Sequence, residues 1–270
     1  MLTLGSPSTT LPVSCWDRSW FPISGEDRRV YRERPSRVPG AFVWNSSVTE
    51  GQQTRVLPDG CMDFIWVGGR VMIAGPDTQA VIYSTGTRAQ VTGLRFAPGF
   101  APGVIGIPAH EFTDTRAFLD EVWPAAVVDQ LVDQLHRSQD PGLVLENLAL
   151  RRYDDTHDPT VAQIVRHVRN GSNTASIAEA VGFSERQLHR RCLKAFGYGA
   201  KRLARILRME RALDLARNGM AFAQAASDAG YADQSHLARD VLELAGLSLS
   251  QLLAESGRSA NSSTELPSGS

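Results

Sequence analysis

The sequence predicts an α+β protein in two parts: a β-rich, barrel- or sandwich-like N-terminal domain and an all-α C-terminal domain with two helix-turn-helix units. Three observations support this. The length of 270 residues exceeds the usual size of one domain. Short extended segments, separated by Gly, Pro and Asp-Gly breaks, run from about residue 29 to residue 118. From about residue 158 to residue 254, apolar residues recur at helical spacing.

We expect a sensor or dimerisation domain over residues 15–150, a DNA-binding domain over 156–256 and a disordered tail over 257–270. Seven strand segments are expected to begin near residues 30, 41, 53, 62, 70, 80 and 89. Trailing helices are expected after Trp123-Pro124, where one apolar face comprises Val127, Val128, Leu131, Val132 and Leu135, and again over residues 143–150. The polar stretch 151–159 is expected to be a linker.

Charge is distributed unevenly along a chain whose formal net charge is −1. Residues 1–158 contain 14 basic and 19 acidic residues, whereas residues 184–217 contain ten basic and three acidic ones, a local net charge of +7. A short basic segment on a near-neutral protein is typical of a surface that binds a polyanion.

Several protein classes are disfavoured. No apolar run approaches the ~18 residues of a membrane-spanning helix, and the first residues lack the pattern of a secretion signal. A cytoplasmic protein without membrane contact is therefore expected. Cys15, Cys61 and Cys192 form no C-x-x-C pair, so buried thiols are expected. The six scattered histidines and the lack of common hydrolase and nucleotide motifs predict no metal, no cofactor and no catalytic residues.

An approximate internal repeat is the most informative feature of the sequence. One copy reads S-I-A-E-A-V-G-F-S-E-R-Q-L-H-R over residues 176–190, and the other reads F-A-Q-A-A-S-D-A-G-Y-A-D-Q-S-H-L-A-R over residues 222–239. Each places Gly four residues after Ala and an aromatic residue next, which suits two closely crossing helices joined by a turn with positive φ. The next helix is expected to be capped by Ser184 in the first copy and by Asp233 in the second.

Each recognition helix is expected to have an inner and an outer face. The inner residues are Leu188, Cys192 and Ala195 or Phe196 in the first unit, and Leu237, Val241 and Leu244 in the second. The outer residues are Arg186, His189 and Arg190 in the first unit, and Gln234, Ser235 and Arg239 in the second. Such side chains read base edges, arginine above all through guanine.

Residues 197–219 predict one amphipathic helix between the units, with Lys201 and Arg202 as phosphate contacts. About twenty residues at 1.5 Å each give roughly 30 Å, close to the ~34 Å of one DNA turn. Two recognition helices at this separation can enter successive major grooves on one face of the duplex.

Residues 158–254 resemble the DNA-binding domain of the AraC/XylS family of transcription regulators. Three features carry the resemblance: the motif A-x-x-x-G-F-S-E-R-Q-L-H-R, the linking helix, and the motif A-A-S-D-A-G-Y-A-D-Q-S-H-L-A-R. The resemblance implies seven helices, and it places Arg186, His189, Arg190, Gln234, Ser235 and Arg239 at the family's base-reading positions. The sequence departs from the family's usual prolines at Ala200 and Leu249. It also has acids at Asp233, Asp240 and Glu243, which predict repulsion of phosphate and a weaker second unit.

The N-terminal half contains V-L-P-D-G-C-M-D-F-I-W, A-G-P-D-T and G-L-R-F-A-P-G, which look like the sensor domain of a subset of AraC-like regulators. Asp59, Asp63, Trp66 and Arg95 are candidate ligand-binding residues, with Arg95 available to a carboxylate. The alternative interpretation places Asp59 in a hairpin turn and Trp66 in the core, with Arg95 paired to an internal acid.

The sequence thus predicts a non-enzymatic, sequence-specific transcription regulator. Its candidate partners are double-stranded DNA, RNA polymerase, an unidentified small-molecule effector and a second copy of the chain. Two alternatives remain at this point: a cupin-like enzyme with an accessory helix-turn-helix domain, and a scaffold whose helix-turn-helix units bind protein.

Overall fold

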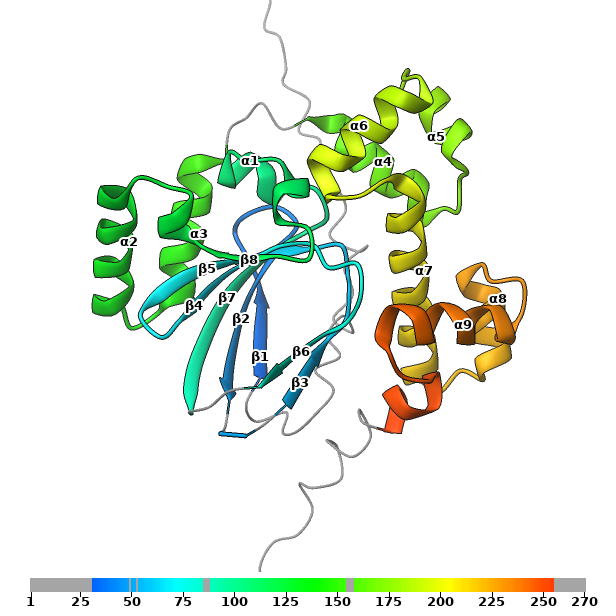
Figure 1. Ribbon diagram of the computed structural model, residues 1–270, viewed down its shortest axis with the longest axis horizontal. Helices are drawn as coiled ribbons and strands as arrows, with labels where there is room; N and C mark the ends of the chain where they lie inside the picture. Colours follow the sequence, from blue (N-terminus) through cyan, green and yellow to red (C-terminus); the bar gives the residue numbers. More distant parts are fainter. Residues whose placement is uncertain (1–30, 49, 52, 85–87, 154–157, 255–270) are drawn as a thin grey trace, which may run out of the picture.

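The computed structural model describes residues 31–48, 50–51, 53–84, 88–153 and 158–254 (Figure 1). Residues 15–30 of the expected N-terminal domain, including Cys15, lie outside the described residues. So do the centre of the expected linker and the tail over 257–270, for which disorder was expected. The described part comprises a β-rich N-terminal region and a helical C-terminal region, as the sequence predicts.

The N-terminal region contains eight strands and three α-helices, together with two 3-10 turns, within the described residues. The strands are β1 (Tyr31–Pro35), β2 (Ala41–Val48), β3 (Gln53–Val56), β4 (Met62–Val67), β5 (Arg70–Ala74), β6 (Val81–Ser84), β7 (Ala89–Phe96) and β8 (Arg116–Phe118). The helical elements are α1 (Ala101–Ile105), η2 (Ala109–Phe112), η3 (Leu119–Glu121), α2 (Ala125–Arg137) and α3 (Pro141–Arg152). All seven predicted strands are present, whereas β8 was not predicted.

Six strands form one antiparallel sheet in the order β1-β2-β7-β4-β5-β8, and β3 pairs with β6 in a second sheet. Alternation along each strand gives the larger sheet two different faces. One face carries Val43, Phe64, Leu94 and Phe96, which are fully buried in a core shared with α1, α2 and α3. The other face carries Asp63 and Arg95, which lie opposite each other on β4 and β7.

Helix α2 confirms the predicted amphipathic helix with one difference. Val128, Leu131 and Leu135 are buried against the sheet, and Val132 packs partly against the same core, but Val127 is 39% exposed. Val127 lies in the first turn of α2, on the edge of the apolar stripe. The predicted stripe is therefore one residue too wide.

The C-terminal region consists of helices α4 (Pro159–Arg169), α5 (Thr174–Ala180), α6 (Glu185–Phe196), α7 (Ala200–Arg217), α8 (Phe222–Ala229) and α9 (Gln234–Ala245), followed by a helical segment over residues 249–254. These seven helical segments match the number that the family resemblance implies. The expected linker is shorter than predicted, because Arg151 and Arg152 end α3 and Asp158 caps α4 by accepting from the Thr160 amide.

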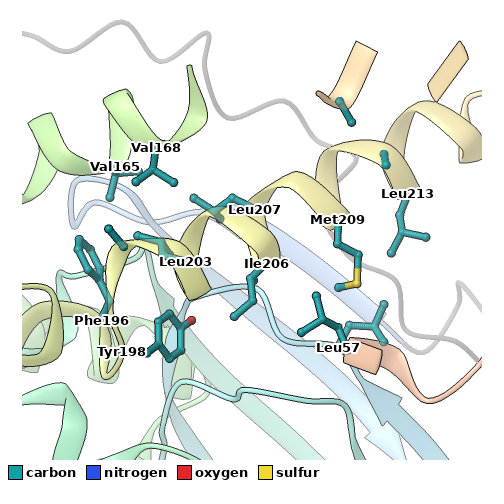
Figure 2. Close-up of a cluster of buried hydrophobic side chains, with 14 of the residues drawn as sticks. Leu57, Val165, Val168, Phe196, Tyr198, Leu203, Ile206, Leu207, Met209 and Leu213 are labelled. Atoms are coloured by element: carbon teal, nitrogen blue, oxygen red, sulfur yellow. The ribbon is translucent and has the colours of Figure 1, made fainter. Parts of the chain in front are cut away.

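Helix α7 is the centre of the C-terminal core. It packs against α4 on one side and against α8 and α9 on the other, and its buried side chains include Leu203, Ile206 and Leu213. Figure 2 shows that Leu57, from the loop after β3, also reaches this core beside Met209. The N-terminal region therefore packs directly against the helix that joins the two helix-turn-helix units.

Candidate nucleic-acid interface

The first helix-turn-helix unit comprises α5 and α6, joined at Gly182. Gly182 has a φ of 71°, the left-handed conformation predicted for it, and the Phe183 amide donates to the Ala178 carbonyl at 2.8 Å. Ser184 then caps α6 in a capping box, in which its hydroxyl accepts from the Gln187 amide and the Gln187 side chain accepts from the Ser184 amide. The sequence signals for this unit are confirmed.

Helix α6 separates its residues into the two predicted faces. Leu188, Cys192, Ala195 and Phe196 are buried, and burial raises the pKa of the Cys192 thiol to about 11. On the opposite face the residues at i, i+3 and i+4 are exposed: Arg186, His189 and Arg190. Three long polar side chains thus project together from one helix surface, next to an exposed Lys194.

The second unit comprises α8 and α9, joined at Gly230 with a φ of 88°. Tyr231 is buried at the junction, as predicted, and its ring contacts His236 edge-on at 5.0 Å between centroids. Asp233 caps α9 by accepting from the His236 amide at 2.7 Å. Its charge therefore stabilises the positive end of the helix dipole.

The outer face of α9 carries the three residues that the sequence places there. Gln234, Ser235 and Arg239 are exposed, while Leu237, Val241 and Leu244 are fully buried. Arg239 differs from Arg190 in one respect, since its Nε donates to the carbonyl of Ser235 at 3.3 Å. The guanidinium of Arg239 therefore lies back along its own helix.

The acids Asp240 and Glu243, in the second half of α9, do not present free charge. Asp240 is 6% exposed and accepts from Arg205 NH2 at 2.8 Å and from Arg208 NH2 at 3.0 Å, both on α7. Glu243 accepts from both terminal nitrogens of Arg205, at 2.9 and 2.7 Å. Two arginines of the linking helix therefore neutralise the two acids from which the sequence predicts repulsion of phosphate.

Ion pairs with acids lower the number of basic side chains in residues 184–217 that are available to DNA. Arg205 and Arg208 bind α9, Arg191 pairs with Asp158, and Arg217 pairs with Asp214. The exposed bases of this segment are Arg186, Arg190, Lys194, Lys201 and Arg211. The predicted phosphate contact Lys201 belongs to this set. Arg202 is half-buried, and its NH1 approaches the Thr78 carbonyl of the N-terminal region at 3.5 Å.

The hydrogen bonds of Asp240 fix α9 to α7. We expect Asp240→Asn to lower the free energy of unfolding at pH 7 by about 1–2 kcal/mol, because it removes charge-assisted hydrogen bonds to partly exposed arginines. Burial alone would raise the pKa of Asp240, but the hydrogen bonds from Arg205 and Arg208 hold it below its usual value. A carboxyl with a lowered pKa stabilises the fold above its unfolded pKa, and this contribution is lost as the pH falls.

The difference between wild type and Asp240→Asn should therefore disappear as the pH falls below about 4. Urea denaturation over this pH range measures it. The matched control is Asp228→Asn, which alters an exposed acid of the same unit that accepts from Gln224 on its own helix. A deficit in Asp240→Asn that persists unchanged at pH 3 would contradict the assignment.

The structure brings three of the four candidate ligand residues together. Arg95 Nε donates to Asp63 Oδ1 at 3.1 Å, and Arg95 NH1 lies 3.4 Å from Asp59 Oδ2. Trp66 lies on the opposite face of the sheet, where its ring meets His136 of α2 at 5.0 Å. The grouping of Trp66 with the other three is therefore wrong, because residues 63 and 66 of one strand point to opposite faces.

Arg95 is thus paired with acids of the protein itself, as the alternative interpretation of this cluster predicts. Burial raises the pKa of Asp63, while the Arg95 guanidinium opposes this shift. With two carboxylates already beside it, Arg95 is not available to a carboxylate ligand in this arrangement.

Sequence reasoning missed Trp44, whose indole Nε1 donates to Asp63 Oδ1 at 2.7 Å. Trp44 lies across from Gly93 on β7, and a Cβ at Gly93 would meet the indole at 2.1 Å. Gly93 is thus required for the close approach of the ring. A glycine in the middle of an otherwise regular strand is the signal that points to such a contact.

The described part of the chain offers neither a metal cluster nor a membrane-spanning helix. Among these residues, no group of three or more His, Cys, Asp or Glu side chains is arranged to hold a metal ion. No helix in this part combines the length and apolar character needed to cross a membrane.

Two family models match the chain. One described as a helix-turn-helix domain matches residues 177–255, and one described as a domain of unknown function, DUF6597, matches residues 41–118. The first match covers most of α5 and all of α6 to α9, and the second covers the sheets from β2 to β8. A search of curated proteins finds no match to the sequence.

Solved structures of ToxT from Vibrio cholerae are similar over most of the chain. One at 1.65 Å resolution is 9% identical, covers 84% of this chain and 99% of ToxT, and has a TM-score of 0.46. ToxT from strain O395 bound to (E)-4-(8-methylnaphthalen-1-yl)but-3-enoic acid is 10% identical with 84% and 99% coverage and a TM-score of 0.46. ToxT from strain SCE256 bound to an unsaturated fatty acid is 12% identical with 84% and 96% coverage and the same TM-score, 0.46.

Proposed function

We propose that this chain, a DNA-binding transcription regulator with an AraC-type helix-turn-helix domain, reads a specific DNA sequence by placing α6 and α9 in successive major grooves. In this proposal Arg186, His189 and Arg190 contact bases from α6. Gln234, Ser235 and Arg239 contact bases from α9. Lys201 and Arg202 contact phosphate at the start of α7.

The observation that carries the proposal is the length and position of α7 between the two units. Its 18 residues correspond to roughly 27 Å at 1.5 Å per residue, to which the turns at both ends add. This is close to the ~34 Å between successive major grooves on one face of DNA. Since Asp240 binds α9 to α7 and the core of α6 is continuous with that of α7, the separation is a property of one packed unit.

The N-terminal region is proposed to regulate this activity, with a small molecule as the candidate signal. Support comes from its contacts with the helical region, where Leu57 enters the core around α7 and Arg202 reaches Thr78. The candidate ligand contacts that remain together are Asp63 and Arg95, on the sheet face turned away from α2, and Asp59, in the loop before β4. A ligand with its own cationic or hydrogen-bonding group suits this mainly acidic cluster better than a carboxylate.

Salt dependence of duplex binding tests the DNA-binding surface. Lys201→Ala should weaken binding to cognate and random duplexes alike and reduce the slope of log affinity against log salt by about 0.9, the value for one phosphate contact. The physical reason is that Lys201 is exposed at the start of α7 and releases a counterion when it neutralises a phosphate. Fluorescence anisotropy between low and physiological salt measures the slope.

Arg151→Ala is the matched control, because Arg151 is an exposed base at the end of α3, outside the helix-turn-helix region. It should leave the slope unchanged. Salt-independent, weak duplex binding by the wild type would instead favour a scaffold whose helix-turn-helix units bind protein.

A further inference from the structure

The C-terminal ends of both recognition helices are hydrogen-bonded by the N-terminal region. At the end of α6, the Gly197 carbonyl accepts from the Thr113 hydroxyl at 3.1 Å. At the end of α9, the Leu244 carbonyl accepts from the Ala80 amide at 2.7 Å and the Ala245 carbonyl accepts from Arg55 NH1 at 2.9 Å. We call Thr113, Ala80 and Arg55 the helix-end contacts.

These contacts satisfy groups that a helix cannot satisfy itself. The last carbonyls of an α-helix have no partner within the helix, and together they form the negative end of its dipole. A hydroxyl or amide donor satisfies such a carbonyl, and the guanidinium of Arg55 adds a favourable charge at the end of α9. The helix-end contacts therefore stabilise the particular position in which each recognition helix meets the N-terminal region.

The approach of the two regions at these points is close. A Cβ at Gly197 would lie 2.5 Å from the Thr113 hydroxyl and 2.7 Å from Pro76, so only glycine fits there. Between the two recognition helices, Gly60 lies against α7, where a Cβ would meet Leu203 at 3.2 Å and Tyr198 Oη at 3.6 Å. Figure 1 shows the sheets beside α7, with the lower end of α6 next to the helical segment that follows β7.

The N-terminal region thus touches all three helices that determine the distance and angle between the two recognition surfaces. We propose that it acts as a brace that holds the two recognition helices at the spacing that α7 defines, and that Arg55 and Thr113 are positioning residues for DNA recognition. This inference rests on the proposed function, in which α6 and α9 each read one half-site. A change in the N-terminal region alters DNA binding through the helix-end contacts, without any contact of that region with DNA.

The test uses the full-length protein and a series of duplexes in which the two half-sites, identified by binding-site selection, are moved apart or together. Each added or removed base pair shifts one half-site by about 3.4 Å and rotates it by about 35°. The wild type should prefer one spacing by at least tenfold over its neighbours. The double variant Arg55→Ala/Thr113→Val should bind the duplex with the preferred spacing roughly three- to tenfold more weakly, which is the loss expected for one or two ordinary hydrogen bonds. It should also show a smaller difference in affinity between the spacings.

Conservative variants separate positioning from a loss of folding. Arg55→Lys and Thr113→Ser each keep a donor, so they should retain the spacing preference of the wild type. Arg70→Ala is the matched control within the N-terminal region, because Arg70 lies at the start of β5 and its ion pair with Asp120 is exposed. It should also leave the preference unchanged.

The outcomes distinguish this inference from the proposed function. A double variant that folds, as measured by its thermal unfolding, and retains the full spacing preference would overturn the brace while leaving the two-groove proposal standing. A wild type that binds all spacings equally would overturn both, because no fixed separation would then exist for the N-terminal region to hold.

Discussion

Replacing Arg95 by alanine should lower the free energy of unfolding of the N-terminal region by about 3–5 kcal/mol, because it leaves a buried carboxylate without its cation. Asp63 is 8% exposed, and its partners among the described residues are Arg95 and the indole of Trp44. A neutral indole donor does not compensate the charge. The deficit, measured by urea denaturation at pH 7, should be among the largest of any single substitution in this region.

The pH dependence of the Arg95→Ala deficit has a defined sign. Burial already raises the pKa of Asp63, and removing the guanidinium should raise it further. A carboxyl whose folded pKa is raised destabilises the fold increasingly as the pH rises above its unfolded value. The deficit should therefore be small below about pH 4, where Asp63 is protonated in both states, and should grow toward pH 7.

A double variant distinguishes the charge from the shape of this site. Arg95→Met/Asp63→Asn removes both charges and keeps an acceptor for Trp44, so it should recover most of the stability lost in Arg95→Ala. Arg70→Ala breaks an exposed ion pair with Asp120 and should cost less than about 1 kcal/mol. Equal deficits in Arg95→Ala and the double variant would show that packing, and not the unpaired carboxylate, is responsible.

Local patterns predicted most of the secondary structure and both helix-turn-helix units. Period-two alternation and turn residues located the strands up to β7. Gly182, Gly230, Ser184 and Asp233 located the turns and caps of both units. These features depend on neighbours within a few residues, which the sequence displays directly.

Pairings between distant segments could not be predicted in the same way. Asp240 looks like a surface acid in sequence, because its partners Arg205 and Arg208 lie 35 and 32 residues earlier on another helix. Glu210 lies in a run of charged residues yet is buried, and this burial raises the pKa of its carboxyl well above the usual value. Its burial follows from the packing of the N-terminal region against α7, which no local pattern contains.

The candidate ligand residues combine a local error with a pairing between distant segments. Asp63 and Trp66 are three residues apart in a strand that the sequence predicts, and the alternation along that strand already places them on opposite faces. Leu57 is a loop residue of the N-terminal half that belongs to the C-terminal core. The sequence boundary between two domains thus does not coincide with the boundary between the two hydrophobic cores.

Arg190→Ala should weaken binding to the cognate duplex by about 1–3 kcal/mol and remove the preference at a single base pair, if Arg190 contacts a guanine through both of its terminal nitrogens. Arg190 is exposed on the outer face of α6, and the described residues offer it no ion-pair partner, so its guanidinium is available to DNA. Binding to random duplexes should change little. Binding-site selection with the variant, read by sequencing, measures the preference at each position.

Arg239 is the matched position on the second recognition helix and provides the internal comparison. Arg239→Ala should remove a preference about one helical turn of DNA away from the position affected by Arg190→Ala. Its effect should be smaller, since Arg239 Nε donates to the Ser235 carbonyl and this contact competes with a base. A uniform loss of affinity on all sequences in Arg190→Ala, with every base preference intact, would show that Arg190 contacts phosphate and not a base.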